Sequence, residues 1–179
     1  MHKIGLELSR SLIPIVAAAS VCLVAPTQAH ADRDRDDHKC TAFVGPFSSV
    51  NGPPCTSPIG MCTHGILGGE FSARYDFTIH TLTPAGDPHD PTKFVYTGTS
   101  VVTVNDGSGV MFTDDTGELH IPADGGPAPF VTKAIVDRGT RRFKHTLGGF
   151  IATGMLEVTT GLATGSFSAV LCKDCKDKD

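Results

Sequence analysis

Alternation of apolar and polar residues with a period of two is the feature that most constrains this fold. It is clearest in "FSARYDFTIH", residues 71–80, and it recurs in "FVYTGTSVVTV", residues 94–104. Successive side chains of a strand point to opposite faces of a sheet, so a period of two predicts strands that are buried on one face. Between the two ends of the chain, no window sustains apolar residues at helical spacing. The sequence therefore predicts an all-β domain.

Shorter strands follow the same pattern and are separated by turn residues. They are predicted at residues 110–113, 118–121, 130–136, 150–158 and 162–171. The intervening segments, such as "NDG" at 105–107 and "DDTG" at 114–117, are rich in residues that favour tight turns. A long strand from Gly65 to Leu82, bent at Gly68-Gly69, brings the number of strands to about eight, the size of a small barrel.

The last predicted hairpin lies in "GGFIATGMLEVTTGLATGSFSAVLC", residues 148–172. Gly154 and Gly165 fall in the middle of its strands, where glycine weakens a strand unless the sheet bends tightly or another backbone approaches closely. Tight bending is a requirement of small closed barrels. We therefore predict a single antiparallel, up-and-down barrel of roughly eight strands, and we assign it to residues 64–172.

The N-terminus has the features of a secretory signal. Lys3 and Arg10 precede an uncharged apolar run at 12–25. This run is shorter than the roughly 20 residues of a membrane span. "AHA" at 29–31 then supplies small residues at the expected cleavage site. These features predict a signal peptide at 1–31, secretion or export to the cell envelope, and no membrane span in the mature chain.

Charged residues dominate both ends of the mature chain. It begins with "DRDRDDHKC" and ends with "CKDCKDKD". Such runs have too little apolar surface to bury, which predicts mobile tails. We assign residues 32–63 to a charged linker with a cysteine-containing loop, and residues 173–179 to a C-terminal tail.

Five of the six cysteines remain once the predicted signal is removed. Disulfides are expected in an exported protein. Cys55 and Cys62 flank "TSPIGM", whose proline and glycine turn the chain, so we predict a short-range bridge between them. Cys40 precedes the predicted barrel and Cys172 ends it, so we predict a second bridge that ties the two ends together. Cys175 would remain unpaired.

Charge and motifs exclude several classes of function. The formal net charge is −4, and only Arg138, Arg141 and Arg142 lie close together, whereas nucleic-acid-binding proteins carry clustered cations. The histidines lack a second ligand at metal-binding spacing, and the serines lack the Gly-x-Ser-x-Gly nucleophile turn. The sequence predicts no nucleic-acid partner, no metal site and no cofactor, and it does not define an oligomeric state.

The segment "VDRGTRRFKHTLGGFIATGMLEVTTGLATGSFSAVLC" resembles the closing part of the allene oxide cyclase and dirigent-like barrels. In that family a Gly-Thr-Gly-Arg-Phe type of turn precedes an Ala-Thr-Gly strand and a glycine-rich last strand. The matching positions are Gly139-Thr140, Arg142-Phe143, Gly148-Gly149 and Ala152-Thr153-Gly154. Arg141 replaces the second glycine of the turn. "CTSPIGMCTHGILGG" and "FVYTGTSVVTVNDG" also look like segments of exported bacterial members.

This resemblance implies a barrel fold and a cyclase activity or a dirigent-like guidance of radical coupling. No motif of this chain matches the catalytic residues of the family, so candidate residues come from their chemistry alone. One set would project into the lumen and contact a ligand: Tyr75, Phe77 and Tyr96. A luminal phenol orients a ligand or is a core tyrosine with a satisfied hydroxyl, and the sequence leaves both open.

A second, polar set would act on a ligand only if it faced the lumen: Glu70, Arg74, Asp76 and His80. We expect Arg74, Asp76 and His80 on the solvent face instead, because the alternate residues of this strand form a better core.

Two functions remain open. In the first, the barrel binds a small apolar molecule or has a non-catalytic role in the envelope. In the second, it is a cyclase, isomerase or dirigent-like protein that acts on a small organic substrate in the lumen. An entirely apolar lumen would favour the first, whereas an accessible ionisable group with a perturbed pKa would favour the second.

Overall fold

The computed structural model describes residues 39–86 and 88–173. The predicted signal peptide with its cleavage site, the charged segment up to residue 38 and the tail from residue 174, including Cys175, lie outside the described residues.

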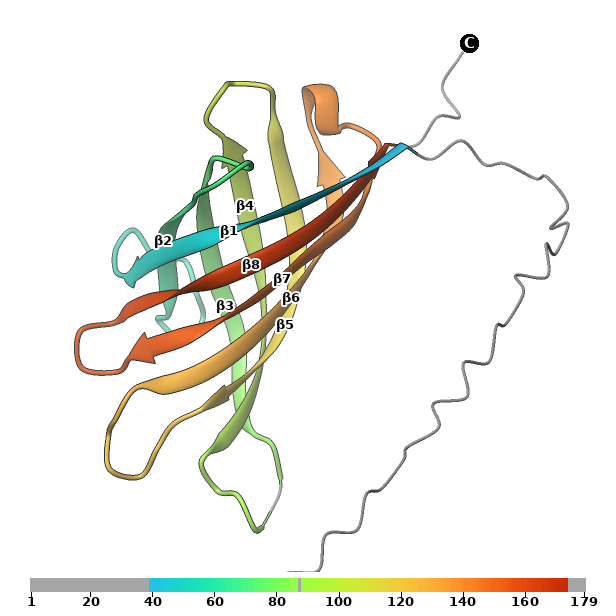
Figure 1. The fold of residues 1–179 in the computed structure, drawn as a ribbon. Coiled ribbons are helices and arrows are strands. Elements are labelled where there is room, and N and C mark those ends of the chain that lie inside the picture. The colour runs from blue at the N-terminus through green and yellow to red at the C-terminus, as the bar shows by residue number, and fades with distance from the viewer. Residues whose placement is uncertain (1–38, 87, 174–179) are drawn as a thin grey trace, which may run out of the picture. The chain divides into compact units, whose positions relative to one another are not determined.

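The described residues form a closed barrel of eight antiparallel strands that follow one another in chain order (Figure 1). The strands are β1 (Lys39–Asn51), β2 (Cys62–Leu67), β3 (Ala73–Pro84), β4 (Lys93–Val104), β5 (Val110–His120), β6 (Ala128–Gly139), β7 (Thr146–Glu157) and β8 (Leu162–Lys173). The predicted fold class is confirmed. The helical content of the described residues is a single 3-10 turn, η1 (Arg141–Phe143).

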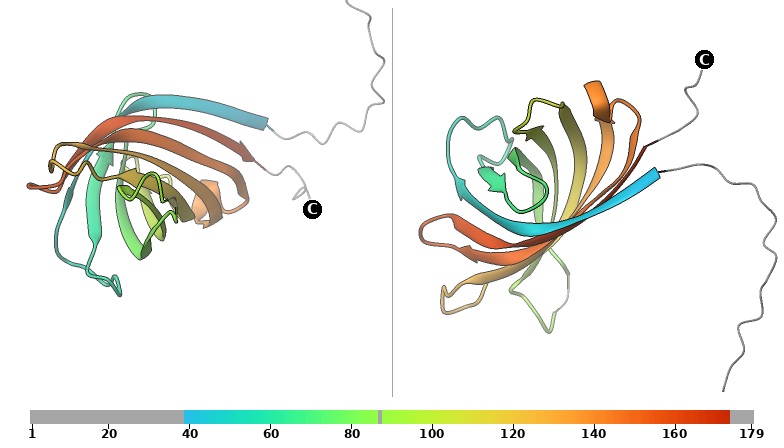
Figure 2. Two further views of the ribbon diagram at one scale, coloured as in Figure 1. Left: turned by 90° about the horizontal axis from the view of Figure 1, so that it is seen from below. Right: turned by 45° about the horizontal axis from the view of Figure 1, so that its top comes forward.

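The barrel closes where its first strand meets its last. β1 pairs with β8 in an unbroken register from Lys39–Lys173 to Val50–Leu162. Figure 2 shows the strands curling around one interior, with β1 and β8 side by side. Each strand therefore has a hydrogen-bonded neighbour on both sides.

The first strand lies in a segment that the sequence analysis assigns to a linker. β1 begins at Lys39, well before the expected start of the barrel at residue 64. Gly45 and Pro46 interrupt its alternation, which hides the strand, yet Phe47 is buried in the core. Pairing with β8 and β2 therefore outweighs the weak local preference for a strand.

Three further strands differ from the prediction. β5 runs without a break from Val110 to His120, so "DDTG" at 114–117 is not a turn, because β4 and β6 supply ladder partners on both sides. The expected long strand from Gly65 to Leu82 is instead two strands, β2 and β3, joined by a turn at 68–72. The predicted number of strands is right, although the predicted bounds are wrong for β1, for β5 and for the segment of β2 and β3.

The two ends of the barrel differ in their packing. The plugged end, as we call it, holds the start of β1, the end of β8 and η1. Its interior is filled by buried side chains, among them Phe71, Ala73, Val104, Met111, Phe143 and Leu171. The opposite end, which we call the mouth end, carries the loop at 52–61 between β1 and β2.

Both predicted disulfides are present. Cys40 and Cys172 are cross-strand partners at the β1–β8 seam, and Cys55 is bonded to Cys62 across the loop at 52–61. Disulfides persist in oxidising compartments, so the two bridges indicate an extracytoplasmic environment.

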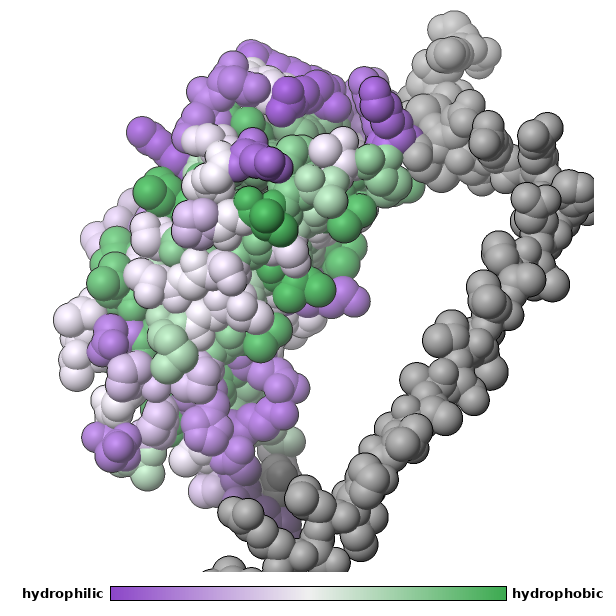
Figure 3. Space-filling view, viewed as in Figure 1, coloured by the Kyte–Doolittle hydropathy of each residue, from purple (hydrophilic) through white to green (hydrophobic). Residues whose placement is uncertain are grey.

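Apolar side chains also occur on the outside of the barrel. Figure 3 shows them over the face formed by β1, β8 and β7. Exposed apolar residues of these strands include Val44, Leu147, Ile151, Met155 and Val170. In the described part of the chain, no helix has the length and apolar character that a membrane crossing requires.

Candidate functional site

A cavity of about 130 Å³ lies inside the barrel, from its middle to the mouth end. Its lining is mostly apolar and includes seven aromatic rings: Phe47, Tyr75, Phe77, Tyr96, Phe130, Phe150 and Phe167. Asn51, which is exposed at the end of β1, also belongs to the lining, so the cavity reaches the surface beside the loop at 52–61. An apolar cavity of about 150 Å³ binds benzene, which sets the size of molecule that fits here.

Glycines on neighbouring strands make room for two of these rings. Gly65 pairs with Tyr75, and Gly117 pairs with Tyr96. A Cβ at Gly65 would lie 2.5 Å from the Tyr75 ring, and one at Gly117 would lie 2.3 Å from the Tyr96 ring. Any larger residue would displace the ring. All three predicted ligand contacts, Phe77 included, line the cavity.

The two phenols are hydrogen-bonded and remain neutral at physiological pH. The hydroxyl of Thr132 lies 2.5 Å from that of Tyr96. Burial raises the pKa of Tyr96 to about 12, although the bond with Thr132 lowers it in part. Burial also raises the pKa of Tyr75, against the lowering effect of a hydrogen bond with Ser49. The Tyr96 hydroxyl donates to the carbonyl oxygen of Val131 at 3.3 Å, so it can donate to a ligand only by giving up this bond.

One carboxyl group lines the cavity, that of Asp115. It extends inward from β5, and the residue is only 2% exposed. The hydroxyl of Thr113 donates to its Oδ1 at 2.6 Å, and the hydroxyl of Ser100 donates to its Oδ2. A carboxylate has about four acceptor positions, so each oxygen can accept a further hydrogen bond.

The surroundings of Asp115 make its carboxyl titrate close to neutral pH. Burial raises its pKa to about 6, because apolar surroundings disfavour the charged form. The hydrogen bonds from Ser100 and Thr113 lower this pKa, the charge of Asp114 raises it, and the charge of His80 lowers it. Among the described residues, no Lys, Arg or His side chain lines the cavity. The carboxyl therefore ionises without a counterion inside the barrel.

The polar set predicted from the sequence does not enter the cavity. Glu70 is exposed in the turn between β2 and β3. Arg74, Asp76 and His80 are exposed on β3, as expected of its solvent face. The structure therefore does not bring these four residues to the lumen.

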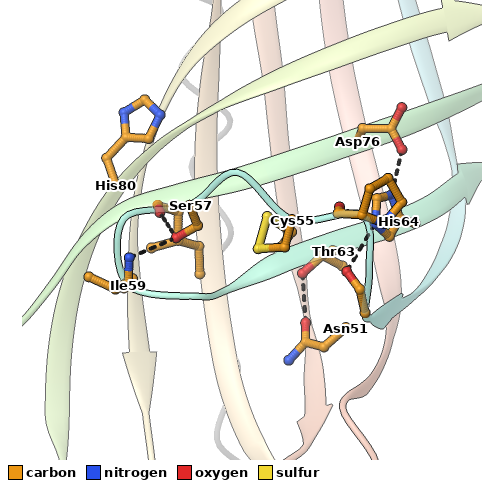
Figure 4. Close-up of a disulfide and its surroundings, with 12 residues drawn as sticks. Asn51, Cys55, Ser57, Ile59, Thr63, His64, Asp76 and His80 are labelled. Carbon is orange, nitrogen blue, oxygen red and sulfur yellow. Dashed lines mark hydrogen bonds and ion pairs between the residues drawn. A yellow bond between two sulfur atoms is a disulfide. The ribbon is translucent and has the colours of Figure 1, made fainter.

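Asp76 instead contacts His64 of β2 on the outside of the barrel (Figure 4). His64 Nδ1 lies 2.7 Å from Asp76 Oδ1, and its Nε2 lies 3.1 Å from the carbonyl oxygens of both Gly52 and Pro54. All three partners are acceptors, so both ring nitrogens are satisfied only when the imidazole is protonated. The hydrogen bond with Asp76 is the main cause that raises the pKa of His64. Protonated His64 therefore fastens the loop at 52–61.

The same loop is held at a second place. The hydroxyl of Ser57, which Figure 4 labels, donates to the carbonyl oxygen of Ile79 at 2.5 Å. The Ile79 N–H donates to the carbonyl oxygen of Met61 at 3.1 Å. Met61 and Thr63 line the cavity. Met61 belongs to this loop, so the loop forms part of the cavity wall.

Asp115 is the site residue that the sequence analysis missed. Its segment reads as a turn from sequence, because "DDTG" is rich in residues that favour turns. The inner face of β5 is nevertheless visible as an alternation: Met111, Thr113, Asp115, Gly117 and Leu119. A strand continued through this segment would have placed Asp115 in the lumen and Asp114 outside.

Within residues 39–86 and 88–173, no three potential metal-ligating side chains come together. The chain matches no protein-family model, curated protein or solved structure with which it was compared. Its function is therefore inferred from the geometry of the cavity.

Proposed function

We propose that this protein is exported and that its barrel binds a small, mainly apolar molecule in the lumen. The cavity carries this proposal, because protein interiors are normally close-packed, whereas this one is hollow, lined by aromatic rings and open at one end. Tyr75, Phe77 and Tyr96 are the proposed ligand contacts. Export is supported by the features of residues 1–31 and agrees with the two disulfides.

Titration with toluene, followed by NMR of the disulfide-bonded protein, tests this proposal. We expect saturable shift changes at residues that line the cavity. Ala152 lines the cavity, so Ala152→Leu should fill it and abolish these changes. Ala42 is exposed on β1, so Ala42→Leu serves as the matched control and should bind as the wild type does. Toluene that causes no saturable change in the wild type would rule out a binding lumen of this kind.

Asp115 favours a second candidate, a cyclase, isomerase or dirigent-like protein that acts in the same lumen. A carboxyl with a pKa of about 6 in an apolar cavity is suited to proton transfer near neutral pH. The resemblance to the allene oxide cyclase and dirigent-like barrels belongs to this candidate. Arg141 supports this resemblance. Its φ of +52° lies in the region that glycine favours, and it stands at the position where the family turn has glycine.

The base-promoted opening of 1,2-benzisoxazole tests whether Asp115 can move a proton. The carboxylate would remove the C3 proton while the N–O bond breaks, giving 2-cyanophenolate, and would then release the proton to water. We expect the rate to rise as Asp115 ionises and to fall by about 100-fold in Asp115→Asn. Asp114→Asn, on the exposed face of the same strand, is the control. A wild-type rate equal to that of Asp115→Asn would eliminate the enzymatic candidate.

A further inference from the structure

The lining of the cavity has an uncompensated charge. Asp115 supplies a carboxyl group, and no cationic side chain of the described residues reaches the lumen. The cation that affects it, His80, is exposed on the outer face of β3. A buried carboxylate is normally paired with a cation, so the missing partner is a property of the site that a ligand can supply.

We propose that the ligand of this cavity is a small organic ammonium ion with an apolar, ring-sized body, whose ammonium group pairs with Asp115. This inference rests on the proposed binding function and specifies the chemical class of the ligand.

The carboxyl is already arranged for such a partner. Ser100 and Thr113 hold its two oxygens in place, each oxygen retains acceptor capacity, and the residue lines the cavity. The group lost its water when the barrel folded, since it is 2% exposed. Binding therefore requires desolvation of the ammonium but not of the carboxylate, which favours the pair over one formed on a hydrated surface.

The rest of the lining suits the body of the same ligand. Aromatic rings attract cations to their faces, and this attraction grows when the cation is desolvated. Phe77 and Tyr96 lie near each other, with ring centroids 5.9 Å apart, and both line the cavity. A volume of about 130 Å³ accommodates a body close to one six-membered ring.

A metal ion would not satisfy this site as well. Hard divalent cations take roughly six or more oxygen ligands, usually with more than one carboxylate. Here one carboxylate is accompanied by neutral hydroxyls, and the described residues hold no cluster of three metal-ligating side chains. An ammonium group needs about three acceptors, which one carboxylate and a neighbouring hydroxyl oxygen nearly supply.

Binding should depend on pH through Asp115. The charged groups that shift the pKa of Asp115 are Asp114 of β5 and His80 of β3, both on the outside. Tyr75 of β3 and Tyr96 of β4 line the same cavity, and the charge of Asp115 raises the pKa of Tyr96. β6 contributes the neutral Thr132 to the same region of the lumen. The phenols stay neutral, so protonation of Asp115 is the event that removes the partner of the ammonium group.

Calorimetric and NMR titrations with benzylamine, benzyl alcohol and toluene test the inference. At about pH 7.5 we expect benzylamine to bind wild-type protein at least about tenfold more tightly than benzyl alcohol. At about pH 4.5 this preference should disappear, because Asp115 is then protonated whereas the amine remains charged. Benzylamine should also lower the pKa of Asp115, measured by NMR of its carboxyl carbon, since the linkage is reciprocal.

Two variants distinguish the contribution of the Asp115 charge to ligand binding from that of the apolar cavity. Asp115→Asn should lose the preference for benzylamine and still bind toluene, whereas Asp114→Asn should keep the preference. If toluene binds but benzylamine shows no preference in the wild type, or keeps it in Asp115→Asn, the ammonium inference is wrong and the binding lumen stands. If none of the three probes binds, the proposed function itself is wrong. The pH comparison uses wild-type protein and does not depend on the folding of a variant.

Discussion

Ionisation of Asp115 places a negative charge in a mostly apolar cavity, on a residue that is only 2% exposed. Its pKa is about 6 in the barrel against an ordinary value of 3.8. One pKa unit corresponds to about 1.36 kcal/mol, so the ionised group destabilises the folded state by on the order of 3 kcal/mol. A residue with this effect on folding is typical of a functional position.

Replacement of Asp115 should therefore stabilise the barrel at neutral pH. Between pH 3.8 and about 6 the native state binds more protons than the unfolded chain, so wild-type stability falls as the pH rises through this window. Asp115→Asn removes this loss, and we expect a gain of up to about 3 kcal/mol above pH 6 that vanishes below pH 4. Urea unfolding across this range measures it, with Asp114→Asn as control. A penalty independent of pH would mean that the hydrogen bonds of the carboxylate outweigh its desolvation.

His64 should give the barrel a second pH dependence, at higher pH. Its folded pKa is raised above 6.5, chiefly by the hydrogen bond with Asp76, so its contribution is full below pH 6.5 and is lost as the pH rises through the folded pKa. His64→Gln should remove this dependence and expose the loop at 52–61 to faster amide exchange. His80→Gln, at an exposed histidine of β3, is the control. Unchanged exchange in His64→Gln would show that the disulfide and Ser57 suffice to hold the loop.

At the scale of elements, strands could be predicted wherever local chemistry and barrel pairing agree. β4 has clear alternation, and the prediction placed it within one residue; β3 alternates as clearly, but the prediction joined it to β2. β5 was split because two aspartates, threonine and glycine favour turns locally, whereas the ladders on both sides favour a strand. That single conflict concealed both the strand and Asp115.

Alternation also fails to identify the inner face on some strands. In β7, Phe150 is buried, but the outward-facing Ile151 and Met155 are also apolar. The sequence therefore predicts that this strand exists without showing which residues line the cavity. Burial on β3 was predictable because its outer face carries charged residues such as Arg74.

Gly154 and Gly165 face each other across β7 and β8. A Cβ on Gly154 would lie 2.4 Å from the carbonyl oxygen of Thr164 and 2.8 Å from the Phe47 ring. A Cβ on Gly165 would lie 2.7 Å from the same ring. The paired glycines therefore let the Phe47 side chain lie against the strands inside the barrel.

Adding a methyl group at either glycine should destabilise the barrel. We expect Gly154→Ala and Gly165→Ala each to lower the free energy of unfolding by about 1–3 kcal/mol, the range for overpacking. Gly52→Ala is the matched control, because a Cβ there meets no atom within 4 Å. Thermal and urea unfolding measure the difference. A gain in stability at both strand positions would contradict the close approach described here.

At the scale of the whole molecule, the sequence indicated a barrel but not its hollow half. The number of strands and the pairing of cysteines follow from local patterns and spacing. Whether a lumen is filled depends on which side chains meet across it. Phe71 and Phe150 meet near the plugged end, with ring centroids 5.7 Å apart, whereas the rings toward the mouth leave a cavity. Such contacts between distant strands are absent from any local pattern.

The seam disulfide should stabilise the barrel more than the loop disulfide does. Cys40 and Cys172 are 132 residues apart in the chain, and Cys55 and Cys62 are 7 apart. Loop entropy gives contributions of about 5 and about 2 kcal/mol, respectively. We expect the double variant Cys40→Ser/Cys172→Ser to lose more stability in urea than Cys55→Ser/Cys62→Ser. The reverse order would show that the short loop, and not the seam, limits unfolding.

The bond between Cys40 and Cys172 also makes the chain between them a covalent ring. A protease that cuts one exposed turn, such as the one at 158–161 between β7 and β8, would open this ring without releasing a fragment. The product would be a permuted linear chain with new ends at the cut, its old ends still joined through sulfur. Proteins outside the cytoplasm meet proteases, and a first cut between Cys40 and Cys172 removes nothing from this barrel while the seam stays oxidised.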